Sequence, residues 1–446
     1  MISRCYHSVI FVVFEAALCN QAFAQQDVRA ITLKQAVDAA IEKGIELKLS
    51  RLDQTSKEFR YKASSTWLLP QLKVSYSAIN TNSPLTTFGL KLDQAKLSAP
   101  DFNPVLLNNP NSRFNFSPKA DVYQAIFDLE KIFQKESARH LLSAAQFEEA
   151  RKREQVTYDA KLAYFDLWLA YKSVEAGNAS LLTSQQILSS GRAHYQQGLV
   201  LLSEVLDAEV MVSAARRNLI AAHSQLLDAS KRLSLVMGQS SFNVYRPETD
   251  LQSIDSTVDT TQNIAAMRAD FAALQKQIQA SETQVKASRA GGLPVIYAFG
   301  DYSFNSPVVT GIGRGGYVIG MQLSWNVFNG NRLKNQASAE QIETTALIER
   351  LSQAKREAVA RLHGAYRALA DARAEYEQAA LEEKAAQASM KILGDRFAQG
   401  LVSTADFSRA SKQVTDAVLD KEKAFYTLNA TQASLDFLLA GTNANR

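Results

Sequence analysis

The chain has 446 residues, of which 46% are hydrophobic and 21% are charged, with a formal net charge of +4. This composition excludes a disordered or collagen-like chain, and the near-balanced charge argues against a nucleic-acid-binding protein. With only 19 Gly and 9 Pro, long uninterrupted elements are favoured over many short strands, so we expect a mainly helical protein.

Residues 1–24 have the pattern of an export signal. A basic start and an apolar run precede Ala22-Phe23-Ala24, a small-x-small cleavage pattern that makes Gln25 the first mature residue. Lipid attachment at Cys19 is the alternative, although a bulky leucine precedes that cysteine. Both cysteines, Cys5 and Cys19, lie in this segment, so disulfide, zinc-thiolate and cysteine-nucleophile chemistry are excluded for the mature chain.

The rest of the chain is an internal repeat. The matching segments are Lys62-Ala63-Ser64 with Lys286-Ala287-Ser288, Leu69-Pro70 with Leu293-Pro294, Ile126-Phe127-Asp128 with Val327-Phe328-Asn329, and 195–200 with 397–402. The spacing between matches shrinks along the chain, so the first half carries about 23 extra residues between Pro70 and Ile126. We assign residues 25–246 to the first repeat and 247–446 to the second.

Each half is predicted to run helix, strand, loop, strand, very long helix, break and long helix. The long helix of the second half covers about 331–397, which is ~100 Å at ~1.5 Å per residue. Apolar residues recur in it at spacings of three and four, the pattern of a coiled-coil seam. They are Ala354, Ala358, Leu362, Ala365, Leu369, Ala372, Tyr376 and Ala379.

One strand shows strict alternation. The residues Tyr317, Ile319, Met321, Leu323 and Trp325 alternate with small or polar residues as far as Val327. This pattern fits a tilted strand of a membrane barrel, and equally a half-buried strand of a soluble sheet. A companion strand at 71–78, with weaker ones at 119–127 and 295–303, favours the barrel.

No apolar run after residue 24 is long enough for a membrane-spanning helix, so the mature chain is either soluble outside the cytoplasm or crosses a membrane as a barrel. Four strands cannot close a barrel, and an open edge in lipid leaves backbone groups unpaired. Several chains must then share one barrel, with eight strands from two chains or twelve from three.

The sequence resembles the TolC family of outer-membrane efflux proteins. The tandem halves, the Leu-Pro before each first strand, the close of each second strand at 126–128 and 327–329, and the Gly-Leu-Val breaks carry this resemblance. It implies a homotrimer whose four strands per chain form a shared twelve-stranded β-barrel in outer-membrane lipid, continued by a periplasmic α-barrel of coiled-coil helices. It also implies as partners a periplasmic adaptor and an inner-membrane pump of the proton-driven or ABC class.

Gly198 and Gly400 stand where helical patterns stop, and we expect both to be left-handed helix C-caps. The resemblance implies that the turn tips contact the adaptor. These tips are Gly198, Leu199, Val200, Gly400, Leu401 and Val402.

Glu204 and Asp406 begin the return helices, where a carboxylate also favours the positive helix end. The resemblance implies that Asp406 lines a periplasmic constriction, which Glu204 would join. Arg409 stands where a second acid is expected, so it can pair with Asp406 and weaken the negative field.

The sequence offers no metal-ligand cluster, phosphate loop, nucleophile elbow or acid/base pair, so we expect no metal, no cofactor and no enzymatic activity. Transport energy would come from the pump. The long first loop, residues 80–119, is open to three interpretations: a lid, a receptor for phage or toxin, and a spacer, which we take as the default.

The leading hypothesis is therefore a passive outer-membrane exit duct for small molecules or proteins. The alternative is a periplasmic adaptor or coiled-coil scaffolding protein without a pore, since adaptors also contain Ala-rich helical hairpins.

Overall fold

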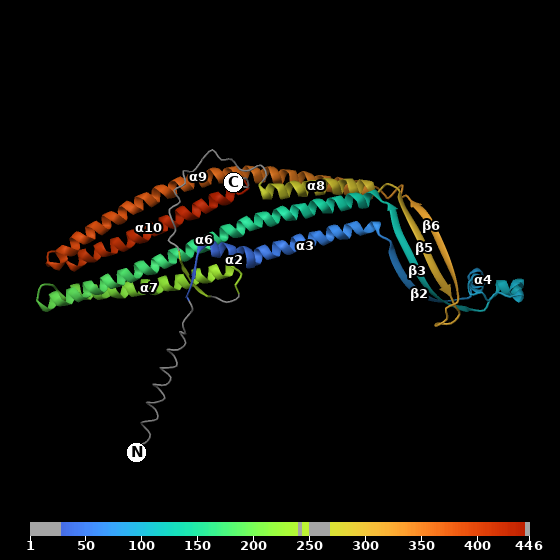
Figure 1. Cartoon of the computed structure of the whole chain (residues 1–446), viewed down its shortest axis with the longest axis horizontal. Coiled ribbons are helices and arrows are strands. Elements are labelled where there is room, and N and C mark those ends of the chain that lie inside the picture. Colours follow the sequence, from blue (N-terminus) through green and yellow to red (C-terminus); the bar gives the residue numbers. More distant parts are fainter. Residues whose placement is uncertain (1–27, 240–242, 249–267, 442–446) are drawn as a thin grey trace, which may run out of the picture. The chain divides into compact units, whose positions relative to one another are not determined.

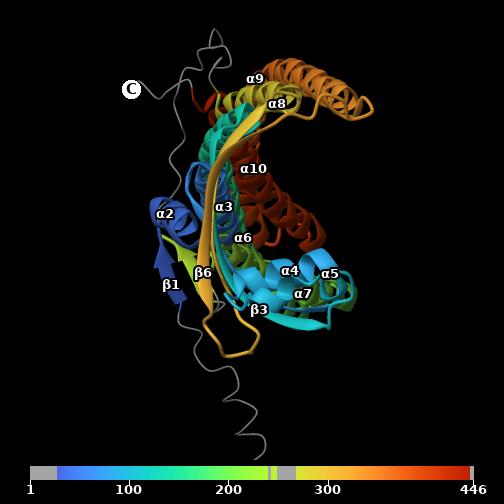
Figure 2. The same cartoon turned by 90° about the vertical axis from the view of Figure 1, so that its right-hand side faces the viewer.

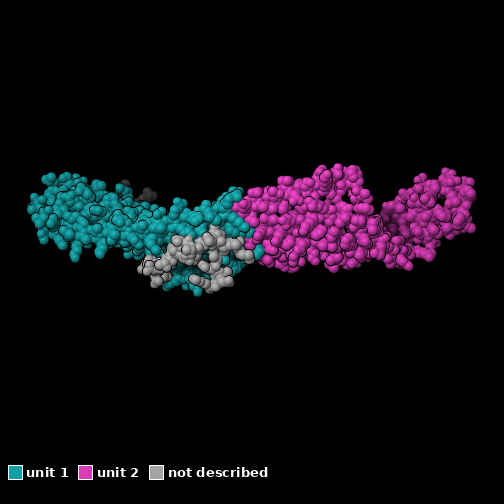
Figure 3. Space-filling view, turned by 90° about the horizontal axis from the view of Figure 1, so that it is seen from above, with its two compact units in different colours: residues 1–52, 147–271, 353–446 teal, residues 53–146, 272–352 magenta. Residues whose placement is uncertain are grey.

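The computed structural model describes residues 28–239, 243–248 and 268–441 (Figure 1). The predicted signal peptide, residues 1–24, lies outside these ranges. Two compact units are formed, one by residues up to Leu52, Phe147–Phe271 and Gln353 onwards, the other by Asp53–Gln146 and Ala272–Ser352 (Figure 3).

The prediction of a mainly helical chain is confirmed. The α-helices are α2 (Leu33–Lys43), α3 (Ile45–Ser65), α4 (Pro84–Asp93), α5 (Pro104–Asn108), α6 (Leu129–Gln196), α7 (Leu202–Val236), α8 (Ala269–Ala290), α9 (Arg332–Ala398) and α10 (Thr404–Leu439). The strands are β1 (Val28–Ile31), β2 (Gln71–Thr81), β3 (Arg113–Phe127), β4 (Val244–Pro247), β5 (Val295–Asn305) and β6 (Arg314–Ser324), and two 3-10 turns cover Thr66–Leu68 and Ala99–Phe102.

The element order repeats. The series α3, β2, β3, α6, α7 has the same sequence of types as α8, β5, β6, α9, α10. Within the described ranges, none of the helices combines the length and the apolar character that crossing a bilayer requires.

The long helix α9 contains 67 residues, about 100 Å at a helical rise of ~1.5 Å per residue. Its predicted seam is confirmed, because Ala358, Leu362, Ala365, Leu369, Ala372 and Ala379 are buried. Four of these residues pack against leucines of α10, namely Leu428, Leu435 and Leu438. They are Leu362, Ala365, Leu369 and Ala372. Alanines in the seam allow the two helix axes to approach closely.

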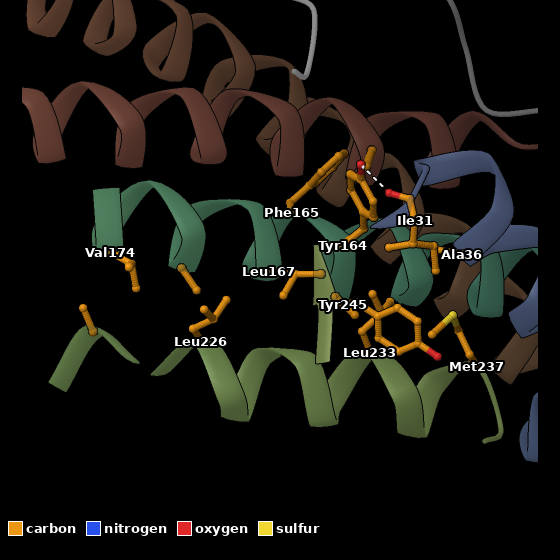
Figure 4. Packing of buried hydrophobic residues seen from close by; sticks show 14 residues of the cluster. Ile31, Ala36, Tyr164, Phe165, Leu167, Val174, Leu226, Leu233, Met237 and Tyr245 are labelled. Carbon is orange, nitrogen blue, oxygen red and sulfur yellow. Dashed lines mark hydrogen bonds between the residues drawn. The ribbon is translucent and has the colours of Figure 1, made fainter. Parts of the chain in front are cut away.

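The main core of the first unit lies where α6 meets α7 (Figure 4). Tyr164 and Leu167 of α6 are fully buried together with Leu233 of α7. The hydroxyl of Tyr164 donates to the carbonyl of Ile31 at 3.3 Å, so this core also fixes the strand β1. Burying a phenol is tolerated because its polar end has a partner.

Two short strands were not predicted. β1 pairs in parallel with β4, from Val28 opposite Val244 to Ile31 opposite Pro247. β1 lies beside α2 (Figure 2), and Thr32 connects them as the N-cap of α2 in a capping box with Gln35.

The second unit contains a four-stranded antiparallel sheet in the order β2-β3-β5-β6. All four strands match the predicted segments, but β6 ends at Ser324 and does not reach Trp325. The last residue of β6, Ser324, pairs with Val295, the first residue of β5. The residue before Val295 is Pro294, which has no N–H with which to extend the ladder.

The long first loop predicted for residues 80–119 is shorter than expected and contains helices. β2 continues to Thr81 and β3 begins at Arg113, and the residues between them include α4, α5 and a 3-10 turn. The cause is local capping. Pro84 and Pro104 start the two helices, and the Asn103 side chain caps α5 by accepting from the Val105 N–H at 2.9 Å.

Candidate functional site

The register of the four-stranded sheet gives it two chemically different faces, since side chains alternate along each strand and paired residues share a face. We define the apolar face by Leu72, Val74, Tyr76, Ala120, Val122, Ala298, Tyr302, Tyr317, Ile319, Met321 and Leu323. We define the polar face by Lys73, Ser75, Ser77, Asn115, Ser117, Lys119, Asp121, Asp301, Ser303, Asn305 and Gln322, which share it with Tyr123, Phe299 and Val318.

Charges on the polar face are paired across strands. The Lys119 ammonium lies 2.8 Å from the Asp121 carboxylate on its own strand and 3.6 Å from the Asp301 carboxylate on β5. The Asn115 amide donates to the Asn305 side chain at 2.7 Å. These contacts show from side-chain geometry that β3 and β5 direct these polar residues to one side.

Four of the five residues predicted to face lipid come together on the apolar face: Tyr317, Ile319, Met321 and Leu323 of β6. The fifth, Trp325, follows the strand, and its indole N–H donates to the Gly292 carbonyl at 2.9 Å. The alternating pattern therefore continues one step beyond the hydrogen-bonded ladder. In the part of the chain that the structure describes, β2 and β6 each pair on one side only, so both are edge strands.

The predicted left-handed caps are confirmed. Gly198 has φ +71° and Gly400 has φ +74°. Leu199 N–H donates to the His194 carbonyl at 2.9 Å, and Leu401 N–H donates to the Arg396 carbonyl at 3.0 Å. These bonds satisfy carbonyl groups that the helix ends would otherwise leave free.

The apolar residues of the tips are arranged alike in both turns. Leu199 is 66% exposed and Leu401 is 71% exposed. The following residues, Val200 and Val402, are half-buried. Both turns thus present a leucine directly after the glycine, and the first turn also exposes Leu201.

The two predicted acids contact the same helix start. Asp406 donates its backbone N–H to the Ser403 hydroxyl at 3.1 Å, and this hydroxyl donates to the Asp406 carboxylate at 2.8 Å. The Glu204 carboxylate accepts the Thr404 N–H at 3.4 Å, across from its own helix. The expected pair of Arg409 with Asp406 is present at 3.1 Å, with both side chains largely exposed.

Sequence reasoning missed Ser403 and Thr404. Ser403 is the N-cap of α10, and the pattern Ser-x-x-Asp before a helix is the signal that would have found it. Thr404 is only 2% exposed, and among the described residues its hydroxyl oxygen finds no hydrogen-bond partner. No local sequence pattern predicts that Thr404 is buried.

A buried ion pair lies elsewhere in the first unit. Arg268 is 5% exposed and contacts the Asp270 carboxylate through two hydrogen bonds of 2.7 Å. Burial alone would raise the pKa of Asp270, but the hydrogen bonds and charge of Arg268 outweigh it and hold that pKa below its usual value. Across residues 28–239, 243–248 and 268–441, no group of three or more His, Cys, Asp or Glu side chains could hold a metal ion.

Comparison with known proteins places this geometry in a family. The model of the family described as outer membrane efflux protein matches residues 36–239 and 260–441. A comparison with curated protein sequences gave no match.

Several solved structures share the fold. The outer membrane channel CmeC of Campylobacter jejuni is 16% identical, with 92% of this chain and 85% of that chain covered and a TM-score of 0.77. The outer membrane protein VceC of Vibrio cholerae is 15% identical, with 91% and 95% covered and a TM-score of 0.73. The MtrE outer membrane channel of Neisseria gonorrhoeae, in its open state, is 15% identical, with 93% of each chain covered and a TM-score of 0.71.

The family model confirms the resemblance found in the sequence, and both family and fold are those of channel proteins. Since that model matches most of the residues, the chain belongs to the outer membrane efflux protein family, whose members are outer-membrane channels that extend into the periplasm.

Proposed function

We propose that the chain is one third of a trimeric exit duct, which passes small molecules or proteins through the outer membrane without using energy itself. Three copies would contribute four strands each to a twelve-stranded barrel. A periplasmic adaptor and an inner-membrane pump of the proton-driven or ABC class would supply the cargo and the energy.

The two-faced sheet carries this proposal. Its apolar face, which includes Leu72, Val74 and Ile319, suits contact with lipid, and its polar face, with Lys119, Asp121 and Asp301, suits contact with water. Its edges β2 and β6 need partners, because unpaired backbone groups in hydrocarbon cost several kcal/mol each. Neighbouring copies of the chain supply such partners when the sheet closes into a barrel.

The helical hairpins account for the remaining parts of the duct. Coiled-coil packing of α9 on α10 gives a long, stiff wall. At its tips, exposed Leu199 and Leu401 would contact the adaptor, together with Gly198, Val200, Gly400 and Val402. Glu204 and Asp406 would surround the periplasmic constriction.

The repeat organisation fits the same proposal. Residues 25–246 and 247–446 would be two copies of one structural unit, so each protomer supplies two similar segments to the wall of the duct. A scaffolding rod without a pore would have no need of a sheet whose faces differ in this way. Membership of a channel family also argues against that alternative.

A charge placed on either face of β6 tests the proposal. Ile319→Arg places the charge on the apolar face, and Gln322→Arg places it on the polar face of the same strand. If the apolar face contacts lipid, Ile319→Arg destabilises the assembled barrel by up to ~2–4 kcal/mol near the bilayer midplane. We expect loss of heat-resistant trimer from outer-membrane fractions for Ile319→Arg and near-normal trimer for Gln322→Arg. Equal trimer yields from the two variants would contradict the assignment of the faces.

A further inference from the structure

The segment between β2 and β3, residues 82–112, is a small folded body. It contains α4, α5 and the 3-10 turn Ala99–Phe102. The Lys91 ammonium lies 2.5 Å from the Asp101 carboxylate, and the Phe88 and Phe102 rings meet edge to face at 5.9 Å. Hydrogen bonds from Lys91 and then Ser98 lower the pKa of Asp101 to about 2. The segment therefore has a defined shape.

A network of buried amides fixes this body to the sheet. Gln94 at the end of α4 is 6% exposed and Asn115 of β3 is 4% exposed. The Gln94 amide donates to the Asn115 side chain at 2.9 Å and to the Phe114 carbonyl at 3.0 Å, and it accepts from Arg113 at 2.9 Å. Because unpaired buried amides are costly, these bonds favour one docked position.

The network lies on the polar face. Asn115 is two residues from Ser117 and four from Lys119, and the register of β2 with β3 is unbroken through all three. Asn305, which Asn115 contacts, lies two residues from Ser303 on the same side of β5. The body formed by residues 82–112 is thus attached at the end of β3, through a side chain that shares the polar face with Lys119, Asp121 and Asp301.

The other connection at this end of the sheet takes the opposite side. In the turn formed by residues 306–313, the Val309 carbonyl accepts the Tyr76 hydroxyl at 2.6 Å, and Tyr76 belongs to the apolar face. The two connections are therefore anchored through different faces of the sheet. α4 and α5 can be followed together near β3 in Figure 2.

We propose that residues 82–112 form a cover that narrows the outer mouth of the duct and limits the size of solutes that approach from outside. The proposal rests on the proposed function, because the polar face lines a pore only if the sheet closes into a barrel. The cover contains two lysines, Lys91 and Lys96, and two aspartates, Asp93 and Asp101, so its formal charge is zero. It discriminates by size and not by charge.

Excision of the cover is the direct test. Thr81 and Arg113 are opposite each other in the register, so a two-residue Asn-Gly turn can replace residues 82–112 and close the hairpin. A single cysteine at Ser117 reports access to the polar face beneath the cover, since the sequence has cysteines only at positions 5 and 19. Intact cells are treated with a small maleimide or with a bulky polyethylene glycol maleimide.

In Ser117→Cys with the cover present, we expect labelling by the small reagent and slow labelling by the bulky one. Excision raises the bulky labelling rate by about an order of magnitude. A second variant serves if the excised chain assembles poorly. Gln94→Ala removes the hydrogen bonds that attach the cover to β3, and it should raise the rate of bulky labelling as excision does. Asn108→Ala, on the exposed surface of α5, is the control and should leave that rate unchanged. Bulky labelling that is as fast with the cover as without it would overturn the proposal.

Thr310→Cys in the exposed 306–313 turn separates this proposal from the proposed function. Both reagents label it equally with or without the cover if the turn lies outside the cell. Absence of labelling at Thr310→Cys in intact cells refutes the outer-membrane orientation itself. Labelling at Thr310→Cys without small-reagent labelling at Ser117→Cys, even after excision, refutes a water-filled pore on the polar face.

Discussion

The turns after α6 and α9 can be compared residue by residue, because Gly198 and Gly400 occupy equivalent places in the two repeats. Both glycines have φ near +70°, and both are followed by an exposed leucine. A Cβ added at either glycine would meet nothing within 4 Å, so the requirement for glycine comes from the backbone conformation alone.

The starts of the return helices differ. α7 follows Leu201, whose side chain offers no hydrogen-bond acceptor, whereas α10 follows Ser403, which caps it through Asp406. The acid of the first turn, Glu204, adds its carboxylate to the start of α10 as well. At the start of α7, by contrast, the N-cap residue Leu201 makes no side-chain hydrogen bond.

This difference shows which parts of the repeat were free to diverge. A chain reversal needs one residue with positive φ, and few residues other than glycine adopt it cheaply. A helix start can be satisfied by its own cap, by a neighbouring side chain or by water. Backbone geometry is therefore retained in both turns, while side-chain contacts have become unequal.

The largest expected effect comes from breaking what the turns share. Gly198→Val and Gly400→Val each force a branched residue into the left-handed region, at about 1–2 kcal/mol per residue. We expect normal trimer abundance with lost efflux for both, measured as drug susceptibility in a strain that relies on this duct. Gly364→Val, in the interior of α9 where nothing crowds an added Cβ, is the control. Unchanged drug susceptibility in both tip variants would show that the conformation of the tips is not needed for coupling to the adaptor.

The caps provide a test of the difference. Ser403→Ala removes the N-cap of α10 and should destabilise it by about 1 kcal/mol, while Leu201→Ala should change little. Leu201→Ser should instead stabilise α7, since it adds an acceptor where none exists. Hydrogen exchange in the first turns of α7 and α10 measures both effects. Equal protection losses in Ser403→Ala and Leu201→Ala would show that the two starts are not capped differently.

The two acids test the predicted constriction. Threefold repetition of Glu204 and Asp406 would gather six carboxylates, which attract cations. The double variant Glu204→Gln with Asp406→Asn should lower cation preference, read from reversal potentials in planar bilayers under a salt gradient. An unchanged reversal potential would place both acids away from the conduction path and leave them only their contacts with the start of α10.

The smallest effect is expected at Arg409. Its pair with Asp406 has side chains 78% and 55% exposed, and such exposed pairs contribute only about 0.2–1 kcal/mol. Arg409→Ala should slightly raise cation preference, because it frees the Asp406 carboxylate. Lys412→Ala, which breaks the exposed pair with Asp416 further along α10, is the matched control. A fall in cation preference in Arg409→Ala would contradict the inference that Arg409 partly neutralises the charge of Asp406.

Elements with a long local period could be predicted from the sequence. The α9 seam from Ala358 to Ala379 needs only spacings of three and four, and β6 needs only alternation, so both are visible within one segment. β1 and β4 have four residues each and no period of their own, and their pairing depends on distant residues. The alternation through Trp325 extends past β6 because the ladder stops where β5 begins, at Val295 after Pro294.

In the candidate site, too, only the features that follow from local sequence rules could be predicted. The left-handed glycines follow from a local rule, and so does the pair of Arg409 with Asp406 at a spacing of three. The contact of Glu204 with Thr404 joins residues two hundred positions apart, and spacing along the chain contains no information about it. The helices inside residues 82–112 were missed because a segment rich in Pro and Asn resembles a loop.

The pairing of β1 with β4 has a consequence for the order of events during export. If residues 1–24 are an export signal, Val28 leaves the membrane among the first residues of the mature chain, and its partner Val244 follows more than two hundred residues later. Parallel pairing of this kind cannot form from neighbouring residues, and contacts of such separation form slowly. In that case β1 would stay without its partner strand β4 until the first repeat has been delivered. Its arrival in place beside Tyr164 would mark the moment at which that repeat is complete.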